Sequence, residues 1–245
     1  MRRSPARIVV VQTAFLGDTV FTSALARSLI ARFPEAAVDL CVSPRGRDVA
    51  LAVPGVAQVI VFDKRGADRG ARGFFRMARH LRELAYDLAV LPHRSLRTAL
   101  LARAAGIPER VGFAGTSGQI LYTSAVPDAG ATFVGREAGL ARALGAQPAP
   151  MRLVARQEWL DRAKAVLLRS AGQGPDAPGD AGSLVFPRAA ALCLGSEWET
   201  KVWPAAHLAS LARSLRAKGF TPLLLGGPRE RPLAAEVLRL APEAG

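Results

Sequence analysis

The chain has 245 residues, half of them hydrophobic, which suits one large globular domain or two smaller ones with a sizeable core. Its formal net charge of +13 comes almost entirely from arginine and favours anionic partners such as phosphorylated substrates, membrane surfaces or nucleic acids. Nucleic-acid binding is disfavoured, because the arginines are scattered through Ala-rich stretches with no dense basic block, zinc-finger spacing or aromatic RNA-binding signature.

The sequence has no long apolar segment and no disulfide pattern. No run approaches the roughly 20 apolar residues of a membrane-spanning helix, and the apolar stretch in MRRSPARIVVV is too short for a signal peptide. Cys41 and Cys193 each lie inside an apolar run, so we expect both to be buried free thiols in strands. We therefore expect a soluble, cytoplasmic protein whose charge also permits contact with a membrane surface.

Short apolar runs alternate with helical patterns over the first 170 residues. The runs predict strands at 7–11, 38–42, 58–62, 87–91 and 120–125. Apolar residues at the i, i+3, i+4, i+7 spacing predict helices at 21–33, 74–88, 97–106, 132–144 and 158–170. Because strands and helices alternate and the strands are continuously apolar, the pattern predicts a mostly parallel sheet with helices on both faces.

The segment SAGQGPDAPGDAGS, at 170–183, is typical of an exposed linker, because it is rich in Gly, Pro and Asp and has no periodicity. The alternation then restarts, with strands at 189–194 and 222–225 and helices at 205–218 and 231–240. We therefore predict an N-terminal domain of residues 1–170, a linker of residues 171–183 and a partial C-terminal domain of residues 184–245. Its two or three strands are fewer than the ~4–6 strands of a typical sheet.

The stretch TAFLGDT, at 13–19, follows the first strand and opens the first helix. In a parallel sheet, ligands bind at this carboxyl edge. The stretch lacks the G-x-G-x-x-G of dinucleotide-binding proteins and the Gly-Lys-Ser/Thr of phosphate loops. Gly17 could simply turn the chain. Asp18 could be a helix N-cap that accepts a backbone N–H bond, or a base that takes a proton from a substrate hydroxyl; this loop alone favours the cap.

A second loop follows the strand at 189–194 and contains Ser196, Thr200 and Lys201, then Trp203 and Pro204. Because proline favours the first position of a helix, Lys201 should stand just before a helix N-terminus. Hydroxyls, an ammonium group and free helical N–H groups would converge there, which predicts a phosphate or diphosphate site. The alternative is a lysine on a solvated loop, with Trp203 in the core.

These loops resemble those of a known family. GSEWETKVWPAAHLASLA resembles the Gly-Ser-x-x-x-Thr-Lys-x-Trp-Pro segment of the ADP-heptose:lipopolysaccharide heptosyltransferases, and RIVVVQTAFLGDTVFTSALARSL resembles their N-terminal segment. Other similar segments follow in the same order: AVDLCVSPRGRDVALAVPGVAQVIVFDK, YDLAVLPHRSLRTALLARAAGIPERVGF, FVGREAGLARALG and LLLGGPRE. The resemblance covers nearly the whole chain. It implies the α/β GT-B fold, two Rossmann-like domains facing across a cleft, here a parallel-sheet N-terminal domain for the acceptor and the beginning of a C-terminal domain for the nucleotide sugar.

The resemblance also implies a reaction. A heptose would move from ADP-heptose to an inner-core lipopolysaccharide sugar with inversion, with no bound metal and no cofactor. Asp18 would be the general base that deprotonates the acceptor hydroxyl. Ser196, Thr200 and Lys201 would hold the diphosphate and stabilise the leaving group, and Glu230 would reach the ribose. The absence of an Asp-x-Asp motif agrees with Lys201 acting in place of a metal cation.

The implied acceptor is anionic, through Kdo carboxylates and phosphates. Residues that follow strands on the same sheet edge as Asp18 are therefore candidates for contacting it: Gly17, Lys64, Arg65, Arg94 and Arg97. We assign no role to His93. The expected partners are thus a nucleotide sugar and an anionic glycolipid, with peripheral contact at the cytoplasmic face of the inner membrane and no nucleic acid.

The family's C-terminal domain extends further than this sequence. It contains a later Asp-Ser/Gly-rich loop that grips the donor, and nothing after Leu225 matches that loop. We therefore expect a C-terminally truncated family member, either a fragment or a truncated gene product. Two alternatives remain: a GT-B transferase for another nucleotide sugar, and an inactive remnant that only binds nucleotide or anionic glycolipid. The genomic DNA downstream of codon 245 would separate the enzyme from the remnant.

Overall fold

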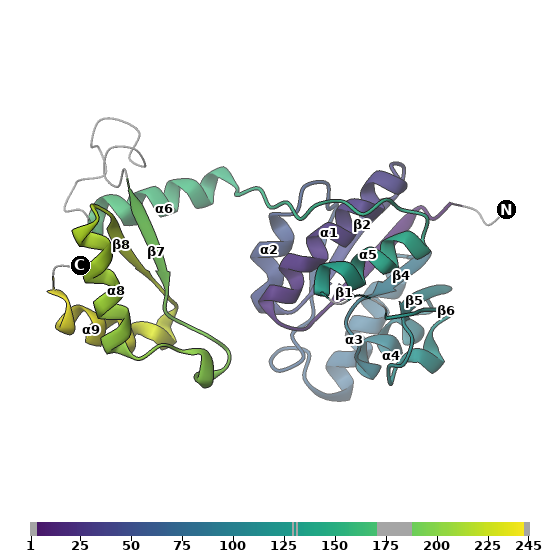
Figure 1. Cartoon of the computed structure of the whole chain (residues 1–245). Helices are drawn as coiled ribbons and strands as arrows, with labels where there is room; N and C mark the ends of the chain where they lie inside the picture. The colour runs from purple at the N-terminus through teal and green to yellow at the C-terminus, as the bar shows by residue number, and fades with distance from the viewer. Residues whose placement is uncertain (1–3, 129, 131, 171–187, 243–245) are drawn as a thin grey trace. The chain divides into compact units, whose positions relative to one another are not determined.

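The computed structural model describes residues 4–128, 130, 132–170 and 188–242 (Figure 1). The chain separates into two compact units, Met1–Arg156 and Gln157–Gly245. Helix α6 (Gln157–Ser170) therefore falls in the second unit, whereas the sequence assigned it to the first domain. Residues 146–156, which precede it, form neither helix nor strand. The predicted linker at 171–183 lies outside the described residues.

The described part of the first unit contains a six-stranded parallel sheet with the order β3-β2-β1-β4-β5-β6. Its strands are β1 (Arg7–Gln12), β2 (Ala37–Val42), β3 (Val59–Val61), β4 (Leu88–Leu91), β5 (Glu109–Phe113) and β6 (Ser124–Val126). This is the doubly wound Rossmann order, which confirms the predicted parallel α/β class. The strand order reverses between β1 and β4, and at such a switch point the loops diverge and leave a crevice at the carboxyl ends of the strands.

Helices cover both faces of this sheet. One face is covered by α1 (Leu16–Arg32), α2 (Arg47–Leu51) and α5 (Phe133–Ala143), and the other by α3 (Gly70–Glu83) and α4 (Leu96–Ala104). Successive side chains of a strand point to opposite faces. Ile8 and Val10 of β1 therefore pack in the core under α1 and α5, while Val9 and Val11 pack in the core under α3 and α4.

The prediction around residue 120 is wrong in part. Gln119–Leu121 form a 3-10 helix with Ile120 87% exposed, and the strand is the shorter β6. Helix α2 and strand β5 were not predicted from the sequence. The ERVGF run of β5 contains two charges and a glycine, so it lacks an apolar pattern, and its pairing with β4 and β6 decides its conformation. Gly112 is needed there, because a Cβ would lie 2.5 Å from the Tyr122 ring.

The second unit contains, within its described residues, a parallel pair of strands, β7 (Ala189–Cys193) and β8 (Thr221–Leu225), with helices α8 (Ala205–Ala217) and α9 (Arg231–Leu240). Leu192 and Leu194 share a core with both helices. Cys193 alternates with these leucines and is exposed, so the prediction that it is buried is wrong, whereas Cys41 is buried as predicted. None of the described helices is long and apolar enough to span a bilayer.

Candidate functional site

Three loops of the first unit come together near the switch point, where residues of two of them contact the side chain of Thr13 in the third. Thr13 follows β1, Lys64 follows β3 and His93 follows β4. The Lys64 ammonium donates to Thr13 Oγ1 at 2.9 Å, and His93 Nδ1 lies 3.1 Å from the same oxygen. Because the ammonium can only donate, the Thr13 hydroxyl proton is free to be donated to Nδ1. That arrangement leaves the imidazole proton on Nε2 of His93.

Burial and positive charge determine the electrostatics of this cluster. Burial lowers the pKa of His93 to about 4, helped by the Lys64 charge and opposed by Asp18, so the imidazole is neutral near pH 7. Burial also lowers the pKa of Lys64, and the charges of Arg97 and Arg65 lower it further. The three cations therefore lie close enough to repel one another. Such a cluster is suited to bind an anionic group.

Asp18 lies in the first turn of α1, next to this cluster. The helix begins at Leu16 with Phe15 as its N-cap. The interpretation of Asp18 as the N-cap is therefore wrong, because Asp18 is the third residue of the helix. Asp18 nevertheless caps the helix from within, because its Oδ2 accepts the Phe15 N–H at 3.0 Å. Among the described residues, Oδ1 has no hydrogen-bond donor, so this oxygen is available to take a proton. The Asp18 charge also influences the pKa of both His93 and Glu137.

Gly17 does not turn the chain, since it lies inside α1 with ordinary helical geometry. A Cβ added there would find no atom of the described residues within 4 Å. Glycine destabilises a helix by about 1 kcal/mol relative to alanine, and the fold itself does not require a glycine here. The missing side chain leaves open space directly beside Asp18, which a ligand can use.

The predicted acceptor-binding arginines differ in their surroundings. Arg97 belongs to the cluster near Lys64, where its guanidinium lies 5.5 Å from the Phe62 ring centre and donates to the Asp68 carbonyl. Arg65 is exposed, and its charge also acts on Lys64. Arg94 instead forms an ion pair at 2.8 Å with Asp128, which also pairs with Arg136, so the charge of Arg94 is partly compensated.

Three residues near Asp18 were missed by sequence reasoning: Thr13, His93 and Glu137. Thr13 and His93 each come shortly after a buried strand, β1 and β4, and this position could have identified them. Glu137 lies on α5 between Arg136 and small residues, and it is 5% exposed. Nothing in the local sequence signals its burial.

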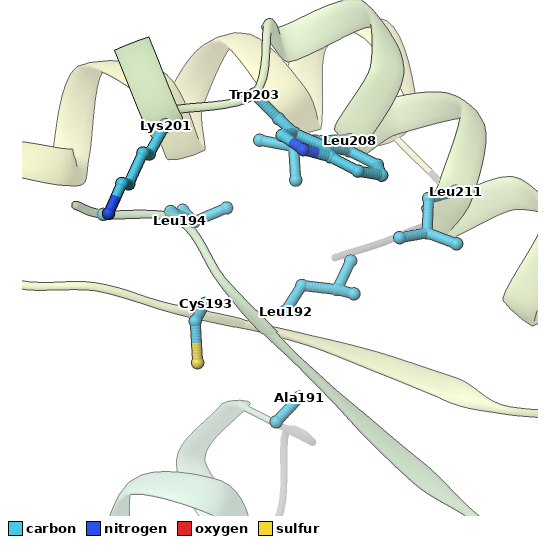
Figure 2. A pocket seen from close by; sticks show the side chains of 9 residues that line it. Ala191, Leu192, Cys193, Leu194, Lys201, Trp203, Leu208 and Leu211 are labelled. Carbon is cyan, nitrogen blue, oxygen red and sulfur yellow. The ribbon is translucent and has the colours of Figure 1, made fainter. Parts of the chain in front are cut away.

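The second unit has a pocket of about 270 Å³ at the carboxyl end of β7. Figure 2 shows Lys201 and Trp203 on one side of it and residues of β7 on the other. Lys201 ends a 3-10 turn, and α8 begins soon after at Ala205, with Pro204 as its N-cap. Lys201 thus precedes a helix N-terminus as predicted. Trp203 is 56% exposed, so it is not the core residue of the alternative interpretation.

Of the other predicted donor-binding residues, Glu230 lies next to a residue that lines this pocket, and Ser196 and Thr200 do not line it. Glu230 Oε2 accepts the Gly227 N–H at 2.7 Å, and a Cβ on Gly195, which lines the pocket, would lie 2.6 Å from Glu230 Oε1. Ser196 and Thr200 are exposed and do not line the pocket. Ser196 Oγ accepts the Trp198 N–H at 3.2 Å. The structure therefore brings Lys201 and Glu230 to the same strand end, where Gly195 lies.

No group of three or more His, Cys, Asp or Glu side chains that could hold a metal ion occurs among residues 4–128, 130, 132–170 and 188–242.

Residues 74–244 match the model of glycosyltransferase family 9 (heptosyltransferase). Among curated proteins, lipopolysaccharide heptosyltransferase 2 of Salmonella typhimurium is 29% identical over 238 residues, and the Escherichia coli K12 protein of the same name is 27% identical over 247 residues. Each alignment covers 95% of this chain and 66% of the relative. The chain thus spans slightly less than two thirds of the length of these relatives.

Solved structures are similar as well. A glycosyl transferase family 9 protein from Veillonella parvula has a TM-score of 0.81 at 20% identity, covering 98% of this chain and 68% of that chain. The E. coli ADP-heptose lps heptosyltransferase II has a TM-score of 0.72 at 26% identity, covering 95% and 68%. E. coli heptosyltransferase WaaC with ADP-2-deoxy-2-fluoro heptose has a TM-score of 0.69 at 19% identity, covering 95% and 73%. These likenesses confirm the predicted GT-B-type fold.

Proposed function

The chain belongs to glycosyltransferase family 9, the heptosyltransferases, and we propose that it transfers a heptose from ADP-heptose to an inner-core lipopolysaccharide sugar. The transfer inverts the anomeric centre and uses no metal ion. The first unit binds the acceptor and the second unit binds the donor. The observation that carries this proposal is the position of Asp18 at the switch point, beside a cluster of cations and the open space at Gly17, where its Oδ1 has no hydrogen-bond donor among the described residues.

In the first unit, Asp18 acts as the general base. The acceptor hydroxyl approaches over Gly17, where no side chain obstructs it. Lys64, Arg65 and Arg97 bind the carboxylates and phosphates of the acceptor, and the partly compensated Arg94 contributes less. The relatives' printed names, lipopolysaccharide heptosyltransferase 2, support an acceptor of this class.

In the second unit, Lys201 and the N-terminus of α8 bind the donor diphosphate, assisted by Ser196 and Thr200. Glu230 accepts hydrogen bonds from the ribose hydroxyls. The neighbouring E. coli structure that contains ADP-2-deoxy-2-fluoro heptose supports an ADP-sugar as donor.

The reaction is a single displacement. The acceptor oxygen forms a bond to the anomeric carbon while the bond from that carbon to the ADP oxygen breaks on the opposite face. The acceptor proton moves to Asp18, and ADP leaves with the bonding electrons. Lys201 stabilises the charge that develops on the diphosphate, and this electrostatic stabilisation takes the place of a metal ion.

We also propose peripheral contact with the cytoplasmic face of the inner membrane, through the exposed side of α3. Phe75 is 64% exposed there, and Arg72 and Arg79 lie one helical turn away on the same side. A basic helix face with an exposed aromatic residue is suited to an anionic lipid surface. The helix begins at the carboxyl edge of the sheet, close in sequence to Lys64.

A transfer assay tests the function. The protein, in the longest form that its gene encodes, is incubated with an inner-core acceptor and with ADP-heptose, ADP-glucose or UDP-N-acetylglucosamine, and the products are identified by mass spectrometry and NMR. We expect transfer from ADP-heptose alone, with an inverted anomeric configuration and no loss on adding EDTA. Transfer only from another nucleotide sugar would support the other GT-B activity, and binding of ADP without transfer would support the remnant.

A further inference from the structure

Glu137 on α5 is a buried carboxyl group that the reaction described above does not use. It is 5% exposed, and its Oε2 has no hydrogen-bond partner among the described residues. Buried carboxylates are normally paired with a cation or held by several N–H donors. The adjacent Arg136 is directed to Asp128, with 3.4 Å between Nε and Oδ1. The surroundings of Glu137 therefore do not suit a negative charge.

The hydrogen bonds around Thr22 indicate which form of Glu137 is present. Thr22 Oγ1 lies 3.2 Å from Gln12 Nε2, 2.9 Å from the Asp18 carbonyl oxygen and 2.8 Å from Glu137 Oε1. Gln12 donates, and the Asp18 carbonyl can only accept. A threonine hydroxyl has one proton to donate. All three contacts are hydrogen bonds only if Thr22 donates to Asp18 and accepts from Gln12 and from a protonated Glu137.

The electrostatics agree with this assignment. Burial raises the pKa of Glu137 to about 8, the Thr22 hydrogen bond opposes the rise, and the negative charge of Asp18 adds to it. Of the elements packed against α5, β6 has no ionisable residue, and α1 carries Asp18, Arg27 and Arg32. Arg27 donates to the Pro150 carbonyl, and the Arg32 guanidinium lies over the Phe33 ring. At the start of β5, Glu109 is followed by Arg110, which donates to the Ile107 and Leu121 carbonyls. None of these arginines is among the groups that shift the pKa of Glu137, so no described cation stabilises its ionised form.

We propose that Glu137 is a positioning residue for the transfer reaction, a neutral carboxylic acid that holds the first turn of α1 through Thr22. This inference rests on the proposed role of Asp18 as the base. Thr22 lies one helical turn after Asp18, so the bond to the Asp18 carbonyl fixes the residue that presents the catalytic carboxylate. An ionised Glu137 would draw the Thr22 proton away from that carbonyl. It would also add a second negative charge close to Asp18.

Glu137 makes the folded protein less stable at neutral pH than at acidic pH, because the carboxyl group ionises in the unfolded chain but stays protonated in the fold. The pKa of Glu137 in the folded state, about 8, lies above the ordinary value of 4.5. Protonation therefore stabilises the fold fully below pH 4.5, and this contribution is lost progressively as the pH rises through 8. A buried acid that disfavours folding at working pH is typical of positions that serve function.

The first test measures unfolding and needs no substrate. Melting temperatures of the wild type and Glu137→Gln are compared from pH 5 to pH 8.5. We expect the Gln variant to gain stability relative to the wild type steadily as the pH rises, because glutamine donates the same hydrogen bond without ionising. Glu35→Gln, at an exposed glutamate, should show no such trend. A melting difference for Glu137→Gln that does not change with pH would overturn the proposal.

The second test measures kinetics on the longest gene product. We expect Glu137→Gln to keep kcat, while Glu137→Leu and the near-isosteric Thr22→Val lower kcat by about 10- to 100-fold with little change in KM. The wild-type kcat should also decline above pH 8, and that of Glu137→Gln should not. Equal losses for Gln and Leu, or full activity for Thr22→Val, would overturn the proposal. Absence of transfer by the wild type would contradict the proposed function instead, since the melting series does not depend on it.

Discussion

At the scale of single residues, Asp18 has a structural role and a proposed chemical role that involve different oxygens. Oδ2 accepts the Phe15 N–H, and Oδ1, which has no donor in the part of the chain that the structure describes, can take a proton. The amide oxygen of asparagine can accept the same Phe15 N–H bond, but asparagine cannot act as a base. One substitution can therefore separate the two roles.

We predict that Asp18→Asn leaves the melting temperature unchanged and lowers kcat by roughly 10²-fold or more, as expected for loss of a general base. Asp48→Asn is a matched control, because Asp48 is an exposed aspartate in the first turn of α2. It should change neither quantity. Near-normal turnover by Asp18→Asn would limit Asp18 to helix capping.

At the scale of elements, α1 contains a glycine that its own packing does not require. A methyl group at Gly17 would contact nothing within 4 Å, and the same is true of Gly139 in α5. Both glycines destabilise their helices, but only Gly17 lies beside Asp18. The two positions therefore form a matched pair.

We predict that Gly17→Ala and Gly139→Ala each raise the free energy of unfolding by about 0.5–1 kcal/mol. Only Gly17→Ala should raise the KM for the acceptor, since its methyl group would occupy the approach to Asp18. Urea unfolding and initial-rate kinetics provide the two measurements. An unchanged acceptor KM for Gly17→Ala would mean that the acceptor does not approach at this position.

The loop between β7 and α8 forms the other element-scale site. We predict that Lys201→Ala weakens ADP binding by about 1.5–3 kcal/mol, the range for a hydrogen bond to a charged group. Lys218→Ala removes the same charge at the opposite end of α8 and should leave the affinity unchanged. Calorimetry with ADP measures both. Equal affinities of the two variants for ADP would mean that Lys201 does not bind the diphosphate and is only a solvated loop residue.

At the scale of the whole molecule, the net charge of +13 predicts binding to anionic lipid. We expect the protein to sediment with phosphatidylglycerol vesicles and not with phosphatidylcholine vesicles. Binding should weaken between about 0.01 M and 0.15 M salt, as the Debye length falls from roughly 30 Å to 8 Å.

A pair of variants with equal net charge tests whether α3 makes this contact. Arg72→Ser combined with Phe75→Ser should weaken vesicle binding about 10-fold, given about 1 kcal/mol per basic residue near the surface and the added loss of an inserted ring. Arg142→Ser combined with Ile120→Ser removes one charge and one exposed apolar side chain elsewhere. Equal weakening by both would mean that net charge alone drives binding.

Local sequence determined most of the element order, the parallel α/β class, the family resemblance and the positions of Asp18 and Lys201 in the loops or first turns that follow strands. The fold and the family match confirm the class and the resemblance. Such features depend on neighbours in the chain, through periodicity and motif spacing. The roles of the individual site residues stay predictions.

Tertiary structure alone decided the strand identity of β5, the cluster around Thr13 and the burial of Glu137. Thr13 contacts residues 51 and 80 positions away, and Thr22 bonds Glu137 across 115 positions. Strand pairing brings distant loops to one sheet edge, and the packing of α5 on α1 removes Glu137 from water. Hydrogen bonds and desolvation arise only in that assembled state, so no local pattern in the sequence signals them.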